Sequence, residues 1–151
     1  MKRFDSDRPE FSPYGFTCQR WTPAGMPRPD RHNEIEVNLL GTGTLTYLFG
    51  GHRTTIEAGR LAVFWAAVPH QIVAFAGEEP YFVLTWPLSE FLASGLELHM
   101  VNRILHGELL METTTDDCCD QRKFQQWERD LRERDPIGEH AARLEVQARL
   151  L

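Results

Sequence analysis

The sequence predicts a β sandwich or barrel that is followed by a pair of helices. Two features support this fold class. Short apolar or alternating segments, separated by glycine and proline turns, fill residues 34–86, which is typical of antiparallel β structure. The last third of the chain instead repeats apolar residues at spacings of three and four, which is typical of amphipathic helices. The length of 151 residues is that of one domain.

Seven short strands are predicted from these patterns. The first lies in a proline-rich segment, and residues 1–30 are otherwise expected to form an arm that lies along the domain or stays mobile. Gly50 and Gly51 predict a hairpin turn between two of the later strands. The strands are expected at residues 16–21, 34–40, 44–49, 52–57, 61–65, 71–75 and 81–86.

The pattern changes toward helix after Pro87. Residues 88–95 predict a short helix, which Gly95 is suited to end. The segment 97–112 is ambiguous, and one interpretation is a helix followed by a returning strand near residues 107–112.

Two further helices are predicted at the C-terminal end. Asp116, Asp117 and Asp120 mark the start of the first, because acidic side chains are favourable near a helix N-terminus. Asp135 and Pro136 are suited to cap and begin the second. Because the second helix ends the chain with no Gly or Pro, we expect more protein to follow in the natural sequence. Its apolar residues have heptad spacing, which predicts a helix-to-helix contact and a homodimer, through Ile137, Ala141, Leu144, Ala148 and Leu151.

The composition excludes several function classes. Sixteen Lys and Arg residues against 22 Asp and Glu residues give a net charge of −6, so this chain by itself is a poor nucleic-acid binder. No apolar run approaches the length of a membrane span, and no basic-then-apolar leader opens the chain, so we expect neither a membrane protein nor a secreted one. The cysteines fit neither a disulfide framework nor a zinc pattern, which predicts reduced thiols in a cytoplasmic protein.

One strand carries most of the chemistry. Ile35, Val37 and Leu39 lie on one of its faces, and the other face carries only polar residues, Asp30, His32, Glu34, Glu36 and Asn38. The simpler interpretation is a solvated polar face opposite a core face. The other interpretation includes His70, which follows a strand at a turn, where functional residues often lie. His32, Glu36 and His70 would then form a two-histidine, one-carboxylate set for a divalent metal, with Asp30 as a further carboxylate.

Two segments resemble the conserved motifs of the cupin superfamily. DRHNEIEVNLLGTG, residues 30–43, resembles the first motif, and GRLAVFWAAVPH, residues 59–70, resembles the second. Asp30 stands where the first motif has a histidine, so the fourth metal ligand differs from the usual pattern. The resemblance implies a double-stranded β-helix, the cupin or jelly-roll barrel, over residues 31–115. The positions that match are His32, Glu36, Gly43, Gly59 and His70.

EVNLL, FWAAVPHQI and TWPLSEFL resemble the effector-binding domain of AraC-type transcription regulators, over about residues 30–135. The resemblance implies that a small effector, such as a sugar, binds inside the barrel. It implies that the helices in residues 116–151 form a dimer, and that DNA is bound only by a helix-turn-helix domain outside this chain. It implies a regulator with no catalytic residues.

A sugar site combines carboxylate and amide groups with an aromatic face in a mostly apolar pocket. The expected ligand-binding residues are therefore Asp30, His32, Glu36, Asn38, Trp65, His70 and Trp86, with Tyr47 and Phe64 as further aromatic candidates. The sequence establishes no cofactor, but His32, Glu36 and His70 would suit a divalent ion such as Zn, Ni, Fe or Mn. The alternative function is a small metal-dependent cupin enzyme, a dioxygenase or sugar isomerase, which needs a tightly held metal with an open position.

Overall fold

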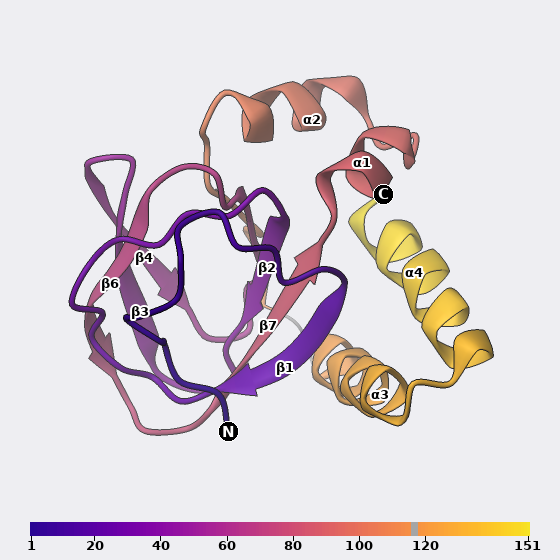
Figure 1. Cartoon of the computed structure of the whole chain (residues 1–151), viewed down its shortest axis with the longest axis horizontal. Coiled ribbons are helices and arrows are strands. Elements are labelled where there is room, and N and C mark those ends of the chain that lie inside the picture. The colour runs from indigo at the N-terminus through magenta and orange to yellow at the C-terminus, as the bar shows by residue number, and fades with distance from the viewer. Residues whose placement is uncertain (116–117) are drawn as a thin grey trace.

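The computed structural model describes residues 1–115 and 118–151 and is mainly β, as the sequence predicts (Figure 1). Strands occur at all seven predicted positions, and a short eighth strand follows the first two helices. The strands are β1 (Thr17–Trp21), β2 (Ile35–Leu39), β3 (Thr44–Phe49), β4 (His52–Glu57), β5 (Ala62–Trp65), β6 (His70–Ala76), β7 (Tyr81–Trp86) and β8 (Leu110–Met111).

The strands form two antiparallel sheets. The five-stranded sheet has the order β1-β7-β2-β5-β8, and the three-stranded sheet has the order β4-β3-β6. Among the described residues no strand ladder joins the two sheets, so the closed cupin barrel that the motifs imply is not confirmed. An isolated bridge between Asp30 and His70 links the residues before β2 to the start of β6.

The turn before β3 depends on a glycine of the first cupin-like motif. Gly43 has a φ angle of 73°, and a Cβ atom at this position would lie 2.0 Å from the carbonyl oxygen of Ala76. No other residue type fits here without moving the backbone, because L-residues disfavour this φ region and the contact is with main-chain atoms.

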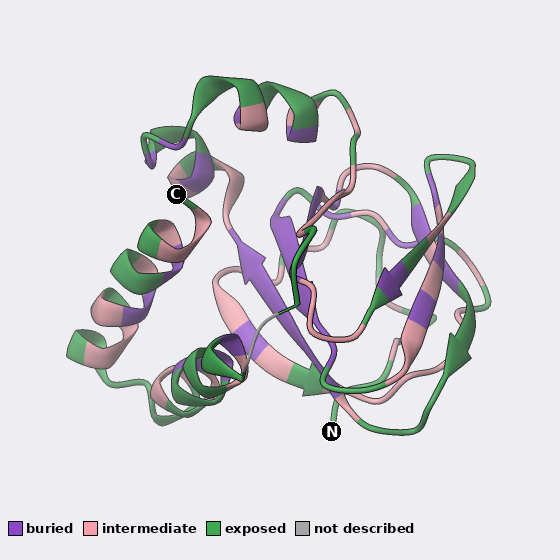
Figure 2. Ribbon diagram, turned by 180° about the vertical axis from the view of Figure 1, so that it is seen from behind, coloured by how far each residue is buried: buried purple, intermediate pink, exposed green. Residues whose placement is uncertain are grey.

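β2 lies between two apolar cores and is buried along its whole length (Figure 2). Its residues Ile35, Val37 and Leu39 belong to the core between the five-stranded sheet and the helices. Glu36 and Asn38 point the other way, into the space between the two sheets, where Tyr47 of β3 donates a hydrogen bond to Asn38. The polar face of this strand is therefore buried rather than solvated.

Helices cover the outer face of the five-stranded sheet, and the predicted C-terminal helix pair is confirmed. The Asp135 side chain caps the last helix by accepting hydrogen bonds from the amides of Ile137 and Gly138. Asp116 and Asp117 lie outside the described residues, and Asp120 lies in the first turn of the preceding helix. The helices are α1 (Leu88–Ala93), α2 (Leu98–Leu105), α3 (Cys119–Glu133) and α4 (Pro136–Leu150).

Arg149 joins three parts of the chain. Its guanidinium donates to both carboxylate oxygens of Asp120, at 2.6 and 2.7 Å, and to Glu112 at 2.6 Å. Such a bidentate pair fixes geometry as well as charge, so the end of α4 is held against the start of α3. None of the helices within the described ranges has the length and apolar composition that crossing a bilayer requires.

Candidate functional site

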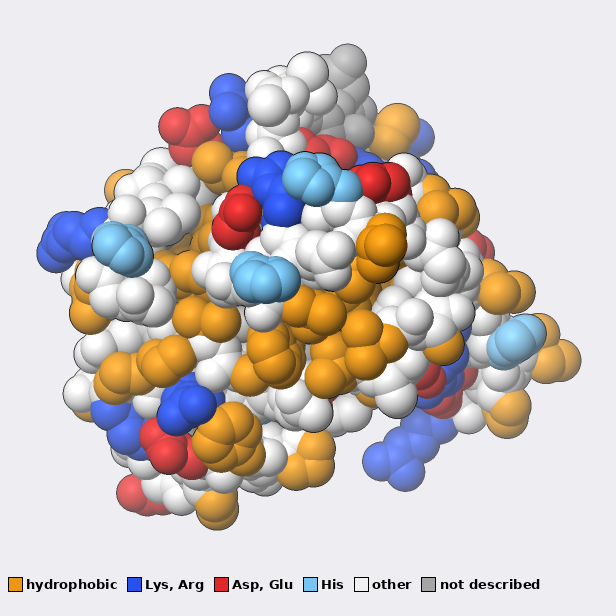
Figure 3. All heavy atoms as spheres, turned by 90° about the horizontal axis from the view of Figure 1, so that it is seen from above, with side chains coloured by type: hydrophobic (Ala, Val, Ile, Leu, Met, Phe, Trp, Pro, Cys, Tyr) orange, Lys and Arg blue, Asp and Glu red, His pale blue; other side chains and the backbone are white. Residues whose placement is uncertain are grey.

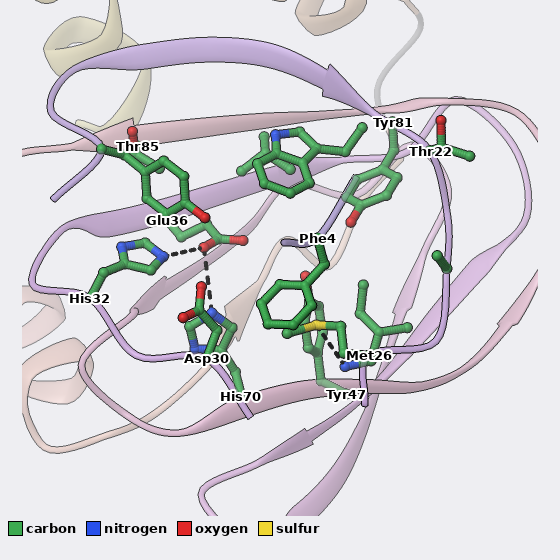
Figure 4. Close-up of a pocket in the computed structure, with 15 residues that line it drawn as sticks. Phe4, Thr22, Met26, Asp30, His32, Glu36, Tyr47, His70, Tyr81 and Thr85 are labelled. Atoms are coloured by element: carbon green, nitrogen blue, oxygen red, sulfur yellow. Dashed lines mark hydrogen bonds and ion pairs between the residues drawn. The ribbon is translucent and has the colours of Figure 1, made fainter. Parts of the chain in front are cut away.

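A pocket lies between the two sheets, beneath the N-terminal segment (Figure 4). It combines carboxylate, imidazole and hydroxyl groups with aromatic and aliphatic walls, and about 40 Å³ inside it is free. Its lining consists of Phe4, Tyr14, Trp21, Thr22, Ala24, Met26, Asp30, His32, Glu36, Tyr47, His70, Ile72, Tyr81, Val83 and Thr85.

The three residues that the motifs single out meet in this pocket. His32 Nε2 lies 3.1 Å from Glu36 Oε2, and His70 Nε2 lies 3.7 Å from the same oxygen. The two imidazole rings are 5.5 Å apart and nearly perpendicular. Asp30, His32 and His70 offer ligand atoms within 4.8 Å of one another, so all four predicted polar residues converge.

Backbone pairing explains this convergence. The amide of Asp30 donates to the carbonyl of His70 at 2.9 Å, and the amide of His70 donates back at 3.1 Å. The amide of His32 donates to the carbonyl of Ala66 at 2.9 Å. The segment before β2 is thereby aligned with the turn between β5 and β6, which brings the two cupin-like motifs together.

Glu34 connects the site to the N-terminal segment, although it is not among the predicted ligand-binding residues. Its Oε1 accepts hydrogen bonds from the amides of Tyr14, at 2.5 Å, and Gly15, at 2.9 Å. Its Oε2 lies 2.9 Å from His32 Nδ1. The only signal in the sequence was its place on the polar face of the strand segment, and that pattern does not reveal a partner 20 residues away.

Burial and hydrogen bonding act in opposite directions on the site's pKa values. Burial alone would lower the pKa of His32, but its hydrogen bonds to Glu34 and Glu36 and their negative charges raise it to about 9. Burial likewise would raise the pKa of Glu34, but the bonds from His32, Gly15 and Tyr14 hold it at about 2. At His70 burial dominates and lowers the pKa. At pH 7 the site therefore holds one charged and one neutral histidine beside carboxylates.

The arrangement of the histidines fits a divalent metal. The Nδ1 atom of His70 bonds the carbonyl of Val68 at 2.9 Å, and that of His32 bonds Glu34. Metal-binding histidines usually have such a partner on the ring nitrogen that does not face the ion. Both Nε2 atoms face Glu36, so His32, Glu36 and His70 would hold an ion, with Asp30 beside them.

Asn38 and Tyr47 lie behind this group. The Asn38 amide donates to Glu36 Oε1 at 3.0 Å, and the Tyr47 hydroxyl donates to Asn38 at 2.8 Å. Asn38 does not line the pocket but fixes the orientation of Glu36, whereas Tyr47 does line it.

Trp65 and Trp86, the predicted aromatic platforms, do not line the pocket. Both pack with the core between the five-stranded sheet and the helices, and Ile35 of β2 lies between them in the sheet register. Successive side chains of a strand point to opposite faces, so Phe64 and Thr85 face inward and their neighbours face the helices. Of the two further aromatic candidates, Tyr47 lines the pocket and Phe64 does not. The other aromatic walls come from Phe4, Tyr14, Trp21 and Tyr81.

No protein-family model matches this sequence. The chain is 28% identical over 90 residues to the melibiose operon regulatory protein of Escherichia coli strain K12, and equally to that of the O6:H1 strain CFT073. The matched region is 60% of this chain and 30% of each relative's length. Over this region the chain is similar to an operon regulatory protein, which at the level of the family supports the resemblance to AraC-type regulators.

Proposed function

We propose that this chain is the ligand-sensing and dimerising part of an AraC-type transcription regulator. A small effector, for which a sugar is the first candidate, binds between the two sheets of a cupin barrel. Binding then controls the DNA contacts of a helix-turn-helix domain outside this chain. In this proposal residues 1–30 form an arm, residues 31–115 the barrel, and residues 116–151 the dimerising helices.

The similarity to the melibiose operon regulatory protein carries this proposal. The pocket supports it, because buried carboxylates and imidazoles stand opposite aromatic rings, as sugar binding requires. The residues proposed to contact the effector are Asp30, His32, Glu36 and His70.

We expect melibiose or a related sugar to raise the unfolding temperature of the chain. A ligand at 100 times its dissociation constant stabilises the folded state by about 2.7 kcal/mol, which is roughly 5–10 °C for a domain of this size. A thermal-shift screen of sugars measures the effect. Glu36→Gln keeps the shape of the side chain but removes its charge, so this variant should lose most of the shift.

Hydrogen exchange with the same sugar tests the sensing step. A ligand that favours one arrangement of the arm or of the helices shifts the population toward it. Protection should therefore change within residues 1–30 or 120–151. Unchanged exchange in both segments at saturating sugar contradicts the mechanism.

A metal-dependent cupin enzyme, a dioxygenase or sugar isomerase, is the second candidate function. The observation that favours it is the close group of Asp30, His32 and His70. A bound ion would polarise an oxygen atom of a substrate. Elemental analysis of the purified protein for Zn, Ni, Fe and Mn separates the two candidates. A stoichiometric metal that survives dialysis, together with no stabilisation by any sugar, would favour the enzyme.

The dimer prediction rests on the apolar seam of α4, formed by Ile137, Ala141, Leu144, Ala148 and Leu151. Ile137, Leu144 and Leu151 are 81%, 55% and 78% exposed, whereas Ala142 and Val146 on the opposite side of α4 are buried against the sheet. A stripe of exposed leucine and isoleucine on a helix is suited to contact a second copy.

Leu144→Asp is expected to turn the dimer into a monomer, because it places a charge in the apolar seam. Sedimentation or light scattering measures the mass in solution. Leu92→Asp on α1 is the matched control, because Leu92 is 54% exposed and lies outside the seam. A dimer lost in Leu92→Asp but kept in Leu144→Asp would instead place the interface at α1. Hydrophobic side chains also collect on the upper face of the molecule (Figure 3).

A further inference from the structure

The free space in the pocket is too small for the proposed effector. About 40 Å³ is free, which is enough for one or two water molecules. Pockets that take small-molecule ligands measure about 300–1,000 Å³. A guest can therefore enter only if part of the lining moves away.

Phe4 is the lining residue that is best placed to move. Eight of the fifteen lining residues belong to strands, whose displacement would break sheet ladders. Phe4 lies outside the strands, near the N-terminal end of the chain. Figure 4 shows its ring in the middle of the pocket, among Met26, Tyr47 and Tyr81. The ring points toward the polar side chains of Asp30 and His70. The side chain occupies the space that a guest would need.

The segment around Phe4, residues 2–8, is held mainly by contacts near the surface. The amide of Lys2 donates to the carbonyl of Arg20, and the carbonyl of Lys2 accepts from the amide of Thr22. The Arg28 guanidinium lies 5.3 Å from the centre of the Phe4 ring and donates to the carbonyl oxygens of Ser6 and Arg8. Water can replace hydrogen bonds of this kind at small cost.

Arg8 adds a contact with a residue that lines the site. Its guanidinium donates to Asp30 at 3.1 Å and lies 3.8 Å from the centre of the Tyr14 ring. Phe4 thus places a ring inside the pocket, and Arg8 of the same segment binds Asp30 in the pocket wall.

From these contacts we infer that Phe4 is an internal ligand of the pocket, and that a guest binds by displacing it. This inference rests on the proposed function in so far as the guest is the effector. It also narrows the class of guest to a compound with a ring of about phenyl size whose hydroxyl groups reach His32 and Glu36. The ring replaces that of Phe4 between Met26 and Tyr81.

Phenol tests the inference without knowledge of the effector, because it carries a ring and one hydroxyl group. Phe4→Ala should bind phenol roughly tenfold or more tightly than the unaltered chain, because the ring's place is then empty. Binding is measured by titration, with the methyl resonances of Ile72 and Val83 reporting the location. Phe11→Ala is the matched control, because Phe11 lies in the same segment but does not line the pocket.

Equal phenol affinity in the unaltered chain and the Phe4→Ala variant would overturn the inference, as would binding that leaves the Ile72 and Val83 resonances unmoved. Phe4→Leu, which retains an apolar side chain, should show an intermediate affinity and guards against a folding defect in the alanine variant. The phenol result is independent of the sugar screen. Failure of every sugar together with tight phenol binding to Phe4→Ala would contradict the sugar proposal and leave the internal ligand in place.

Discussion

Replacing Trp127 with alanine is expected to destabilise the folded chain by roughly 3–5 kcal/mol, the usual cost of deleting a large buried aromatic side chain. Trp127 is 1% exposed, and its ring centre lies 5.0 Å from that of Phe124. Its Nε1 also donates to Glu145 of α4 at 2.8 Å. The substitution therefore removes core packing and a hydrogen bond between α3 and α4 together.

Urea unfolding measures this loss, and Trp127→Phe is the control. Phenylalanine keeps most of the apolar volume but lacks the N–H group, so it should recover most of the stability. A loss of less than about 1 kcal/mol for Trp127→Ala would be that of an ordinary substitution and would contradict the described docking of the helices.

The packing of α3 on the five-stranded sheet matters for sensing, because β7 contacts both α3 and the pocket. Phe82 of β7 packs on Phe124 of α3 with ring centres 5.6 Å apart. Tyr81, Val83 and Thr85 of the same strand line the pocket. A displacement of β7 by a guest would therefore move α3 directly.

Glu34→Ala is expected to raise the hydrogen-exchange rates of the Tyr14 and Gly15 amides by roughly a hundredfold. Both amides donate to Glu34 Oε1, and a hydrogen bond to a charged group contributes roughly 1.5–3 kcal/mol. Because about 1.4 kcal/mol corresponds to a factor of ten, the loss of these bonds should open the segment locally.

Hydrogen exchange followed by NMR measures this change residue by residue. Glu10→Ala is the matched control, because Glu10 is an exposed glutamate in the same segment. Unaltered rates at Tyr14 and Gly15 in Glu34→Ala would show that these amides are held by other contacts.

The strands and the two-faced pattern of β2 were predictable from the sequence, because period-two alternation is a local property of the chain. The meeting of His32, Glu36 and His70 depended on the resemblance to cupin motifs. Alternation alone favoured a solvated polar face. The structure decides this point, because the polar side chains of this face are buried and Tyr47 donates a hydrogen bond to Asn38.

Apart from Tyr47, the aromatic walls of the pocket could not be predicted, because they depend on how distant segments pack. Trp65 and Trp86 looked suitable by composition, but the helices cover the face of the sheet that these rings occupy. Phe4 and Tyr14 reach the pocket from an irregular segment that has no periodicity from which to infer a direction.

The paired backbone bonds between Asp30 and His70 have a mechanical consequence. Asp30 leads into the five-stranded sheet, and His70 begins an outer strand of the three-stranded one. A guest or ion held by the side chains of both Asp30 and His70 would therefore link the two sheets. Separation of the sheets would lower the affinity for this guest or ion. By reciprocity, a bound guest or ion would oppose the separation of the sheets. The force needed to unfold the domain should therefore rise with the fraction of chains that hold a guest or ion.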